Sequence, residues 1–386
     1  AGPACSYYLA LLGADVIKVE SVFKGDAMRH RGGTYEEGNL VGMSTPYLTQ
    51  ASGKRSIAID ISKKEGFEIF EKLLKISDVL VENHLPITLD KLGLTPHYFN
   101  IINNKLIHCS LTGYGRNGDK ENVPAYDVNI QAISGLMNLT GFEEQGPIRT
   151  GAPIIDYGVA LAASFAISSA LFKRSQTGKG SFIDVSMLET AYTLMSSTVV
   201  DYLITGNEPK QRGNAANSKS PAAGSFACKD GLISLGINEE HQFVALAKML
   251  KKEKWLVDER FSNKNNRKKN KNLLIAELQE ILKTKTAEQW EILANNFKVP
   301  AARVLSLKES LNLKQNCARN FIHEFDSDNL KVLTLPFRFN NQKNHPPITP
   351  PSRLGENTIE ILKELGFKNC QIKLLKKNNV VFYEDK

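Results

Sequence analysis

The sequence predicts an α/β fold, with a large domain built on a parallel, Rossmann-like sheet and a smaller α+β domain. In the first half of the chain, short apolar strands alternate with helical segments, which is typical of βαβ units and a parallel sheet. Beyond about residue 206 the pattern changes to a polar linker and then to Lys-rich helices. The chain has 386 residues, which is more than a single hydrophobic core usually fills.

The first half carries the elements of the expected βαβ units. A helix over 5–12 ends at Gly13, because glycine is a common helix stop. The expected strands cover 14–20, 56–60, 79–81 and 106–111, and helices over 158–173 and 187–203 follow them. Ligands of such sheets bind beyond the carboxyl ends of the strands. The expected binding region is therefore formed by the loops at 21–33, 82–86 and 112–115.

A polar linker at 206–221 divides the two predicted domains. After it we expect a strand at 231–236 and a helix capped by Asn238. The predicted divisions are 1–205 for the large domain, 215–314 for the small domain, and 315–386 for a return to the large domain.

Composition limits the partners. The net charge of +8 and the pI near 9.0 favour anionic ligands. The Lys/Asn-rich run 264–271 contains no aromatic residue on which bases could stack, so we expect a solvated surface and no nucleic-acid partner. The apolar stretch 153–172 includes Asp156 and three serines, which indicates a buried helix of a soluble protein and no membrane segment.

The five cysteines are scattered, odd in number and without CxxC spacing. This pattern disfavours disulfides and a zinc site and is typical of a reducing compartment, so we expect a cytoplasmic protein with no metal. Cys109 lies in an apolar run and is expected to be a buried, inert thiol.

Asp156 is the outstanding candidate for chemistry. The sequence lacks GxGxxG, GxxxxGK[ST], GxSxG and HExxH patterns, so nucleotide, serine-hydrolase and zinc-protease functions have no support. Asp156 stands between an Ile pair and a helix rich in Ala, Gly and Ser, where an ionised carboxylate can act as nucleophile or base. The alternative is an ordinary helix N-cap.

Other polar residues have equally plain alternatives. Tyr126 and Asp127 precede a helix-like run and could be a core tyrosine and a capping aspartate. His84 and His108 lie near strand ends, where a hydrogen-bonded structural histidine is the usual role. The basic loops at 29–33 and 53–55 could contact phosphates or simply be solvated.

A set of short segments, spread over nearly the whole chain, carries a resemblance to a known family. The segments are Ala1-Gly2-Pro3, Leu12 to Glu20, Gly25-Asp26 with Arg29, Gly53 to Ile57, Asp78 to Asn83, Tyr126-Asp127 with Ser134 to Met137, Thr177 to Gly180, and Leu354 to Thr358. Together they resemble the class III coenzyme A transferases, which include formyl-CoA transferase, carnitine CoA-transferase and α-methylacyl-CoA racemase.

The resemblance implies a function for the chain and a role for Asp156. Its carboxylate is expected to attack an acyl-CoA thioester, forming an aspartyl anhydride and then an aspartyl-CoA intermediate, from which CoA passes to a small carboxylic acid. Coenzyme A is then a substrate, with no tightly bound cofactor. The large domain would bind it through Ala1, Arg29, Ile59, Asn83, Lys91, Leu92, Tyr126 and Met187. The resemblance also implies an interlocked homodimer.

The sequence departs from the family pattern at several positions. Ser21 and Ser62 replace basic residues, so two possible phosphate contacts are absent, and His84 replaces a frequent aromatic residue, which disfavours adenine stacking there. The segment 214–220 is not glycine-rich as it is in formyl-CoA transferase, which disfavours formyl or oxalate substrates.

Two other functions remain open. The racemase branch has a histidine where Tyr126 stands, which disfavours an acyl-CoA racemase or isomerase because racemisation needs two acid/base groups. A non-catalytic protein that binds CoA or another polyanion is the third possibility.

Overall fold

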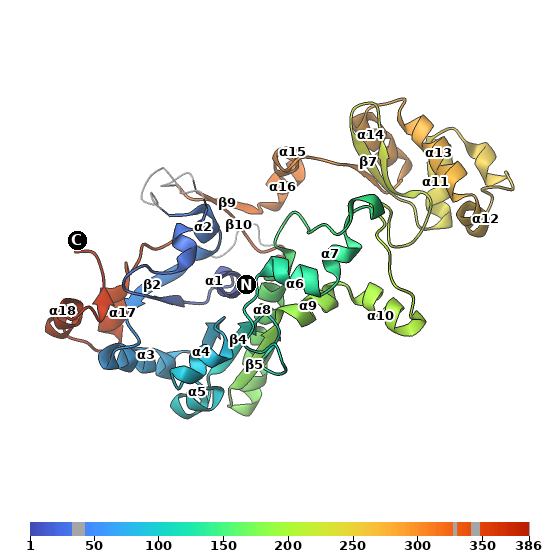
Figure 1. Ribbon diagram of the computed structural model, residues 1–386. Coiled ribbons are helices and arrows are strands. Elements are labelled where there is room, and N and C mark those ends of the chain that lie inside the picture. The colour runs from blue at the N-terminus through green and yellow to red at the C-terminus, as the bar shows by residue number, and fades with distance from the viewer. Residues whose placement is uncertain (33–42, 327–329, 341–347, 386) are drawn as a thin grey trace. The chain divides into compact units, whose positions relative to one another are not determined.

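The computed structural model describes residues 1–32, 43–326, 330–340 and 348–385 (Figure 1). The chain divides into two compact units, the first comprising 1–136, 149–207 and 314–386, and the second 137–148 and 208–313. The predicted large domain of 1–205 included 137–148, which the structure groups with the second unit. Hydrogen bonds tie this segment to the second unit, because the Gln211 amide nitrogen donates to the carbonyl oxygens of Thr140 and Gly146, at 2.7 and 2.8 Å.

Two three-stranded sheets dominate the first unit. One has the order β1 (Val16–Glu20), β2 (Lys54–Ile59), β11 (Val381–Phe382), and the other β3 (Val79–Glu82), β4 (Ile107–Thr112), β5 (Ser181–Ser186). All neighbours are parallel except β11, which runs antiparallel to β2. Strands β9 (Ile322–Glu324) and β10 (Lys331–Leu333) form a separate antiparallel pair.

The α/β class is confirmed, but the expectation of one parallel sheet is wrong in detail. The strands expected near the N-terminus form parallel pairs, yet β1 and β3 are not hydrogen-bonded to each other. Helix α1 (Gly2–Leu11) contacts both strands. A helix with contacts to both sheets therefore replaces the ladder that would have joined them.

Helices cover these sheets. The helices of the first unit are α2 (Thr45–Ala51), α3 (Lys64–Ile76), α4 (Pro86–Lys91), α5 (Pro96–Ile102), α6 (Asp127–Ile133), α8 (Ile154–Thr177), α9 (Met187–Leu194), α10 (Ser196–Thr205), α16 (Lys314–Arg319), α17 (Thr358–Glu364) and α18 (Asn369–Lys377), with the 3-10 turn η1 (Ala27–His30). The single helix predicted over 187–203 is two helices, because the chain leaves helical geometry at Met195.

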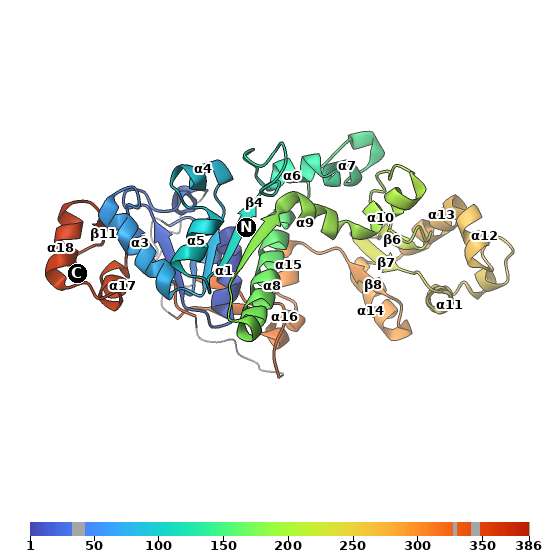
Figure 2. The same ribbon diagram turned by 90° about the horizontal axis from the view of Figure 1, so that it is seen from below.

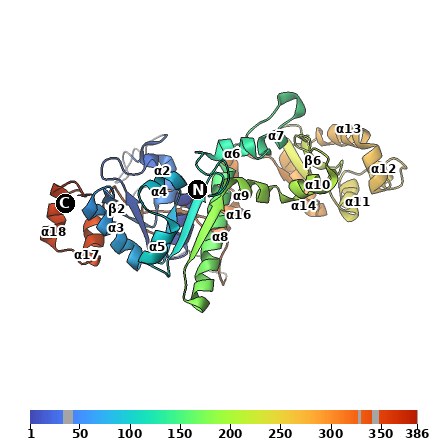
Figure 3. The same ribbon diagram turned by 60° about the horizontal axis from the view of Figure 1, so that its bottom comes forward.

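Helix α8 is the central packing element of the first unit. Its buried residues share a core cluster with β4, β5 and α1, and Figure 3 shows α8 running beside β5. A Cβ atom added at Gly158 would lie 3.0 Å from Leu194 Cδ1, so this glycine allows α8 and α9 to approach closely. With 24 apolar-rich residues α8 could also cross a membrane by length and composition, a property that core helices of soluble proteins share.

The C-terminal segment completes the first sheet. Residues of α17, α18 and β11 share a core cluster with Ile57, Ile59, Ile69 and Leu73, and Figure 2 shows α17 and α18 close to α3. Ser56 fixes this return, since its Oγ accepts from the Gly355 N–H at 3.0 Å and its carbonyl from the Asn357 N–H at 3.0 Å. Gly355 has φ +66°, and a Cβ there would lie 2.4 Å from the Phe382 carbonyl oxygen.

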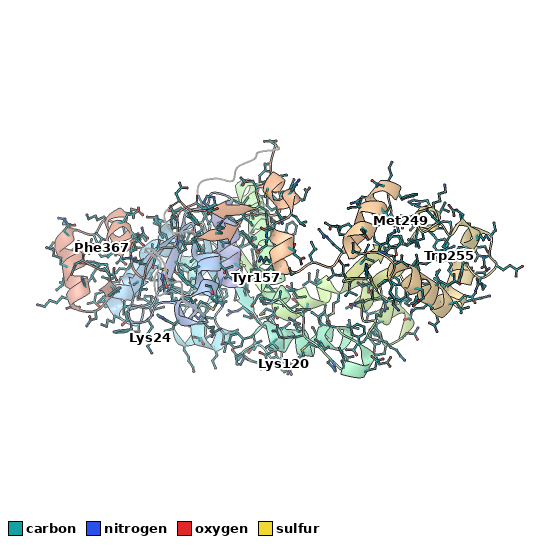
Figure 4. All side chains as sticks on the ribbon, turned by 90° about the horizontal axis from the view of Figure 1, so that it is seen from above. Lys24, Lys120, Tyr157, Met249, Trp255 and Phe367 are labelled. Carbon is teal, nitrogen blue, oxygen red and sulfur yellow. The ribbon has the colours of Figure 1, made fainter. Side chains whose placement is uncertain are left out.

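The second unit is a small α+β structure. Its antiparallel sheet has the order β6 (Ala223–Ala227), β7 (Leu232–Gly236), β8 (Ala301–Arg303). Its helices are α7 (Leu136–Leu139), α11 (Glu240–Met249), α12 (Lys264–Lys269), α13 (Lys271–Leu282), α14 (Ala287–Phe297) and α15 (Leu307–Leu311), with the 3-10 turns η3 (Glu143–Gln145) and η4 (Glu253–Leu256). The core includes Met249 and Trp255, both labelled in Figure 4. The N-cap of α11 is Glu239, one residue after the Asn238 that we predicted.

Lys54 at the start of β2 makes the stability of the first unit depend on pH. Its side chain is buried, and within the described residues its Nζ donates to two neutral acceptors, the Pro3 carbonyl at 2.7 Å and Ser6 Oγ at 2.9 Å. Burial, followed by the nearby Lys18 charge, lowers the pKa of Lys54 from 10.5 to about 7. The unfolded chain therefore holds this proton between pH 7 and 10.5 while the folded chain releases it, so the contribution to stability rises with pH.

We expect the stability of the Lys54→Met variant, relative to that of the wild type, to be highest at pH 7 and below, where the wild type buries a charge. Thermal unfolding of both proteins between pH 6 and 10 measures this, and the difference in Tm should move in favour of the wild type as the pH rises (about pH 7 to 10). A difference that is flat over the whole range would contradict the assignment.

Candidate active site

Asp156 lies in the first turn of α8, as its third helical residue. Its carboxylate is about one-third exposed, with 37% of the side chain accessible, and Oδ1 lies 3.3 Å from the backbone nitrogen of Ala1. The next residue, Tyr157, is labelled in Figure 4, and its hydroxyl accepts a long 3.5 Å hydrogen bond from Gln50 of α2. The carboxylate is therefore accessible, and its polar contact within the described part of the chain is with the Ala1 nitrogen.

A different aspartate caps α8. Asp127, buried at the start of α6, accepts hydrogen bonds at Oδ2 from the N–H groups of Ile155 at 2.8 Å and Asp156 at 3.1 Å. Its Oδ1 accepts from the amide of Gln131, one turn along α6, at 2.5 Å. The interpretation of Asp127 as a capping residue holds for α8, whereas the N-cap of its own helix, α6, is Tyr126.

Several of the coenzyme-binding residues that the resemblance implied lie near the starts of α8 and α9. Ala1 and Tyr157 pack against the core cluster that contains Met187, which is buried at the first position of α9. Asn83 lies directly after β3 with its side chain against Gly2 of α1, since a Cβ there would be 3.5 Å from Asn83 Cγ. Asn83 and Ala1 thus belong to one neighbourhood, and Ala1 contacts Asp156.

Three more implied residues are exposed on the same unit. Lys91 and Leu92 stand at the end of α4, which follows β3 and Asn83. Tyr126 is 62% exposed, precedes the capping Asp127, and has the Arg31 guanidinium 5.5 Å from its ring centroid. Arg31, which the sequence grouped with Arg29 in a basic loop, is therefore the cation of that loop beside Tyr126.

Arg29 and Ile59 are placed differently. Arg29 is buried, with Nε and Nη2 donating to Glu20 at 2.8 and 2.7 Å and Nη2 also to the Ser352 carbonyl at 3.1 Å. Its guanidinium also stacks on Tyr47 at 4.1 Å. Phosphate binding by Arg29 would have to break this pair. Ile59, the last residue of β2, is 2% exposed and belongs to the core cluster of that sheet.

The structure reveals a charged network that sequence reasoning missed. Glu82 at the end of β3 lies 3.2 Å from His108 Nε2 and 3.9 Å from Arg116 Nη1. Burial alone would raise the pKa of Glu82, but hydrogen bonds from His108 and Ser110 outweigh it and hold the pKa below its usual range. His108 is thus a hydrogen-bonded structural histidine, and the network fixes the backbone from which Asn83 projects.

The described residues contain no group of three or more His, Cys, Asp or Glu side chains placed to hold a metal ion.

Comparison with known sequences identifies the family. The sequence model of CoA-transferase family III matches residues 1–358, and the chain belongs to this family. The resemblance drawn from the sequence motifs is thereby confirmed. The protein is a class III CoA-transferase, an enzyme that transfers coenzyme A to carboxylic acids and uses CoA thioesters as substrates.

Two curated relatives cover most of the chain. Human succinyl-CoA:glutarate CoA-transferase is 32% identical over 369 residues, covering 95% of this chain and 83% of its own length. Formyl-CoA:oxalate CoA-transferase from Shigella sonnei is 29% identical over 407 residues, covering 98% and 96%.

The fold is also that of solved relatives. A CaiB/BaiF family protein from Brucella suis superposes with a TM-score of 0.83 at 31% identity, covering 95% of each chain.

The buried Arg29–Glu20 pair gives a test of its role. Arg29→Gln leaves the Glu20 carboxylate buried without its main partner, so we expect a loss of about 3 kcal/mol of unfolding free energy. The KM for acyl-CoA should change less than about threefold, because the guanidinium is buried against Glu20 and Tyr47. Denaturant unfolding and steady-state kinetics measure both quantities. A large rise in KM with unchanged stability would indicate instead that Arg29 binds the coenzyme.

Proposed function

We propose that Asp156 is the nucleophile of this CoA-transferase and that the reaction passes through covalent aspartyl intermediates. The observation that supports this most strongly is that Asp156 stands in the first turn of α8 without acting as its cap, since Asp127 accepts from the N–H groups of Ile155 and Asp156. The Asp156 carboxylate is therefore accessible and not engaged by the helix backbone. An ionised, uncommitted carboxylate is a competent nucleophile toward a thioester.

In the first half-reaction, an Asp156 carboxylate oxygen attacks the thioester carbonyl carbon and the C–S bond breaks. CoA leaves as the thiolate, and the acyl group remains on Asp156 as a mixed anhydride. The thiolate then attacks the aspartyl carbonyl, which releases the donor acid and forms an aspartyl-CoA thioester.

The acceptor carboxylate attacks this thioester, and the same two steps run in reverse with the new acid. Each step exchanges one activated acyl bond for another, so neither ATP nor a metal enters the balance, and no tightly bound cofactor is required.

Each tetrahedral intermediate carries an oxyanion that needs a donor. The Ile155 and Asp156 N–H groups are already occupied by Asp127, which excludes the nearest amides of α8 in this arrangement. The Ala1 nitrogen, 3.3 Å from Asp156 Oδ1, is a donor next to this carboxylate. Ala1, Asn83, Lys91, Leu92, Tyr126 and Met187 are the residues that we propose for binding the coenzyme.

For the acyl groups we propose small carboxylic acids, dicarboxylic acids included. The named activity of the human relative, on succinyl-CoA and glutarate, supports this class. The segment 214–220 lacks the glycine run of formyl-CoA transferase, which disfavours formyl and oxalate groups. Assays that combine succinyl-CoA and acetyl-CoA with a series of mono- and dicarboxylic acids measure the preference.

We expect Asp156→Asn to reduce CoA transfer by at least about 10³-fold, because the amide cannot form the anhydride. With the wild type and acyl-CoA, hydroxylamine should convert the acylated side chain into a hydroxamate, which peptide mass spectrometry locates at residue 156.

Asp78→Asn provides the matched control, because Asp78 pairs with Arg174 at the opposite end of α8. It should retain both transfer and trapping. Transfer that persists in a folded Asp156→Asn protein contradicts the covalent route.

We propose that the protein is a homodimer whose subunits cover an apolar surface on α8. Leu161, Phe165 and Phe172 lie on one side of this helix and are 46, 76 and 68% exposed. Phenylalanines so exposed on a core helix indicate a surface that another protein covers. A second copy of the chain is the occupant that the family resemblance implies.

Phe165→Asp should shift the protein from dimer to monomer in analytical ultracentrifugation, since a charge would have to be buried in the interface. Ile101→Asp is the control, because Ile101 is 66% exposed on α5 and away from α8 in the sequence. A wild-type protein that sediments as a monomer at micromolar concentration would refute the proposal.

A further inference from the structure

The first turn of α8 has every backbone N–H group engaged. The Ile154 N–H donates to the Ala152 carbonyl at 2.9 Å and the Tyr157 N–H to the Pro153 carbonyl at 3.4 Å. The two between them, of Ile155 and Asp156, donate to Asp127 Oδ2. Helix starts normally leave such groups for a side chain of the first turn or for water. Here the acceptor comes from α6, 28 and 29 residues earlier in the sequence.

This arrangement affects Asp156 directly. A carboxylate in the first turn of a helix is attracted to the N–H groups at that end and to the positive end of the helix dipole. If Asp127 did not occupy the Ile155 and Asp156 N–H groups, the Asp156 carboxylate would be the nearest carboxylate in sequence able to accept from them. It would then turn toward the helix backbone and away from a thioester.

The bond network extends to the segment that leads into α8. Gln131 is fully buried and donates to Asp127 Oδ1, while its Oε1 accepts from the Thr150 N–H at 2.9 Å. Asp127 and Gln131 stand four residues apart on α6 and so lie on the same face. Together they hold both the chain entering α8 and its first turn.

We propose that Asp127, supported by Gln131, is the positioning residue of the active site: it takes over the cap of α8 and keeps the Asp156 carboxylate free for attack. This rests on the proposed nucleophilic role of Asp156. Asp127 does not touch the reacting atoms. Its effect should therefore appear in kcat and in the rate of Asp156 acylation, and not in the binding of acyl-CoA.

Asp127→Asn and Asp127→Ala test the hydrogen bonds. In Asp127→Asn the amide oxygen can still accept from α8, but its NH2 group then faces the NH2 group of Gln131. We expect kcat to fall about 10-fold in Asp127→Asn and about 100-fold in Asp127→Ala, the scale associated with an ångström of misplacement. The KM for acyl-CoA should stay within about threefold, and hydroxamate trapping at residue 156 should slow by the same factor as kcat.

A reciprocal exchange separates geometry from simple loss of the charge. In the Asp127→Asn, Gln131→Glu double variant, the new carboxylate accepts from the new amide and from the Thr150 N–H, and the amide oxygen accepts from α8. Every bond is retained with one reversed. We expect this protein to recover most of kcat, while Gln131→Glu alone, with two carboxylates in contact, should be poorly active.

Asp230→Ala is the matched control, because Asp230 Oδ1 accepts from the first N–H of α14 at 2.8 Å and so caps another helix from a distance. It should lower Tm without changing kcat.

The proposal is overturned if folded Asp127→Ala keeps its kcat, or if the exchange variant unfolds like the wild type but stays as slow as Asp127→Asn. Failure of the wild type itself to form a hydroxamate would instead refute the nucleophilic role of Asp156.

Discussion

The hydrogen bonds from the start of α8 to the Asp127 carboxylate are the contacts on which the site depends. Buried N–H groups need an acceptor, and a helix start presents several of them at once. The fold supplies that acceptor from α6, so the helix start does not need the Asp156 carboxylate as its cap. One carboxylate holds the helix, and the other, at Asp156, remains accessible beside the Ala1 nitrogen.

Several of the motifs that relate this chain to its family have a structural role. The Glu20 carboxylate accepts from Arg29, from the Asp26 N–H and from Ser56 Oγ, and Ser56 in turn accepts from Gly355. Four separate motifs thus meet at one buried carboxylate. Burial would raise the pKa of Glu20, but Arg29 outweighs it and holds the pKa below its usual range. These residues join the N-terminal and C-terminal segments of the first unit.

The sequence predicted what depends on local pattern. The β-strands, the long apolar helix and the prominence of Asp156 all follow from periodicity and from residues adjacent in the chain. The burial of Arg29 was not predictable, because a basic residue in a glycine-containing loop reads as solvated until its partner Glu20 is seen to face it. The cap of α8 by Asp127 and the division of the sheet beside α1 depend on contacts between distant segments, which no local pattern contains.

The return of the C-terminal segment onto β2 has a consequence for biosynthesis. Ile361, Ile372 and Val381 complete the core that contains Ile57 and Ile69. This core therefore cannot form until the ribosome has synthesised the chain as far as Val381. The second unit, whose core lies between residues 222 and 299, has no such dependence. During translation the second unit can thus fold first, while the apolar side chains of β2 and α3 remain exposed to solvent and need protection from aggregation.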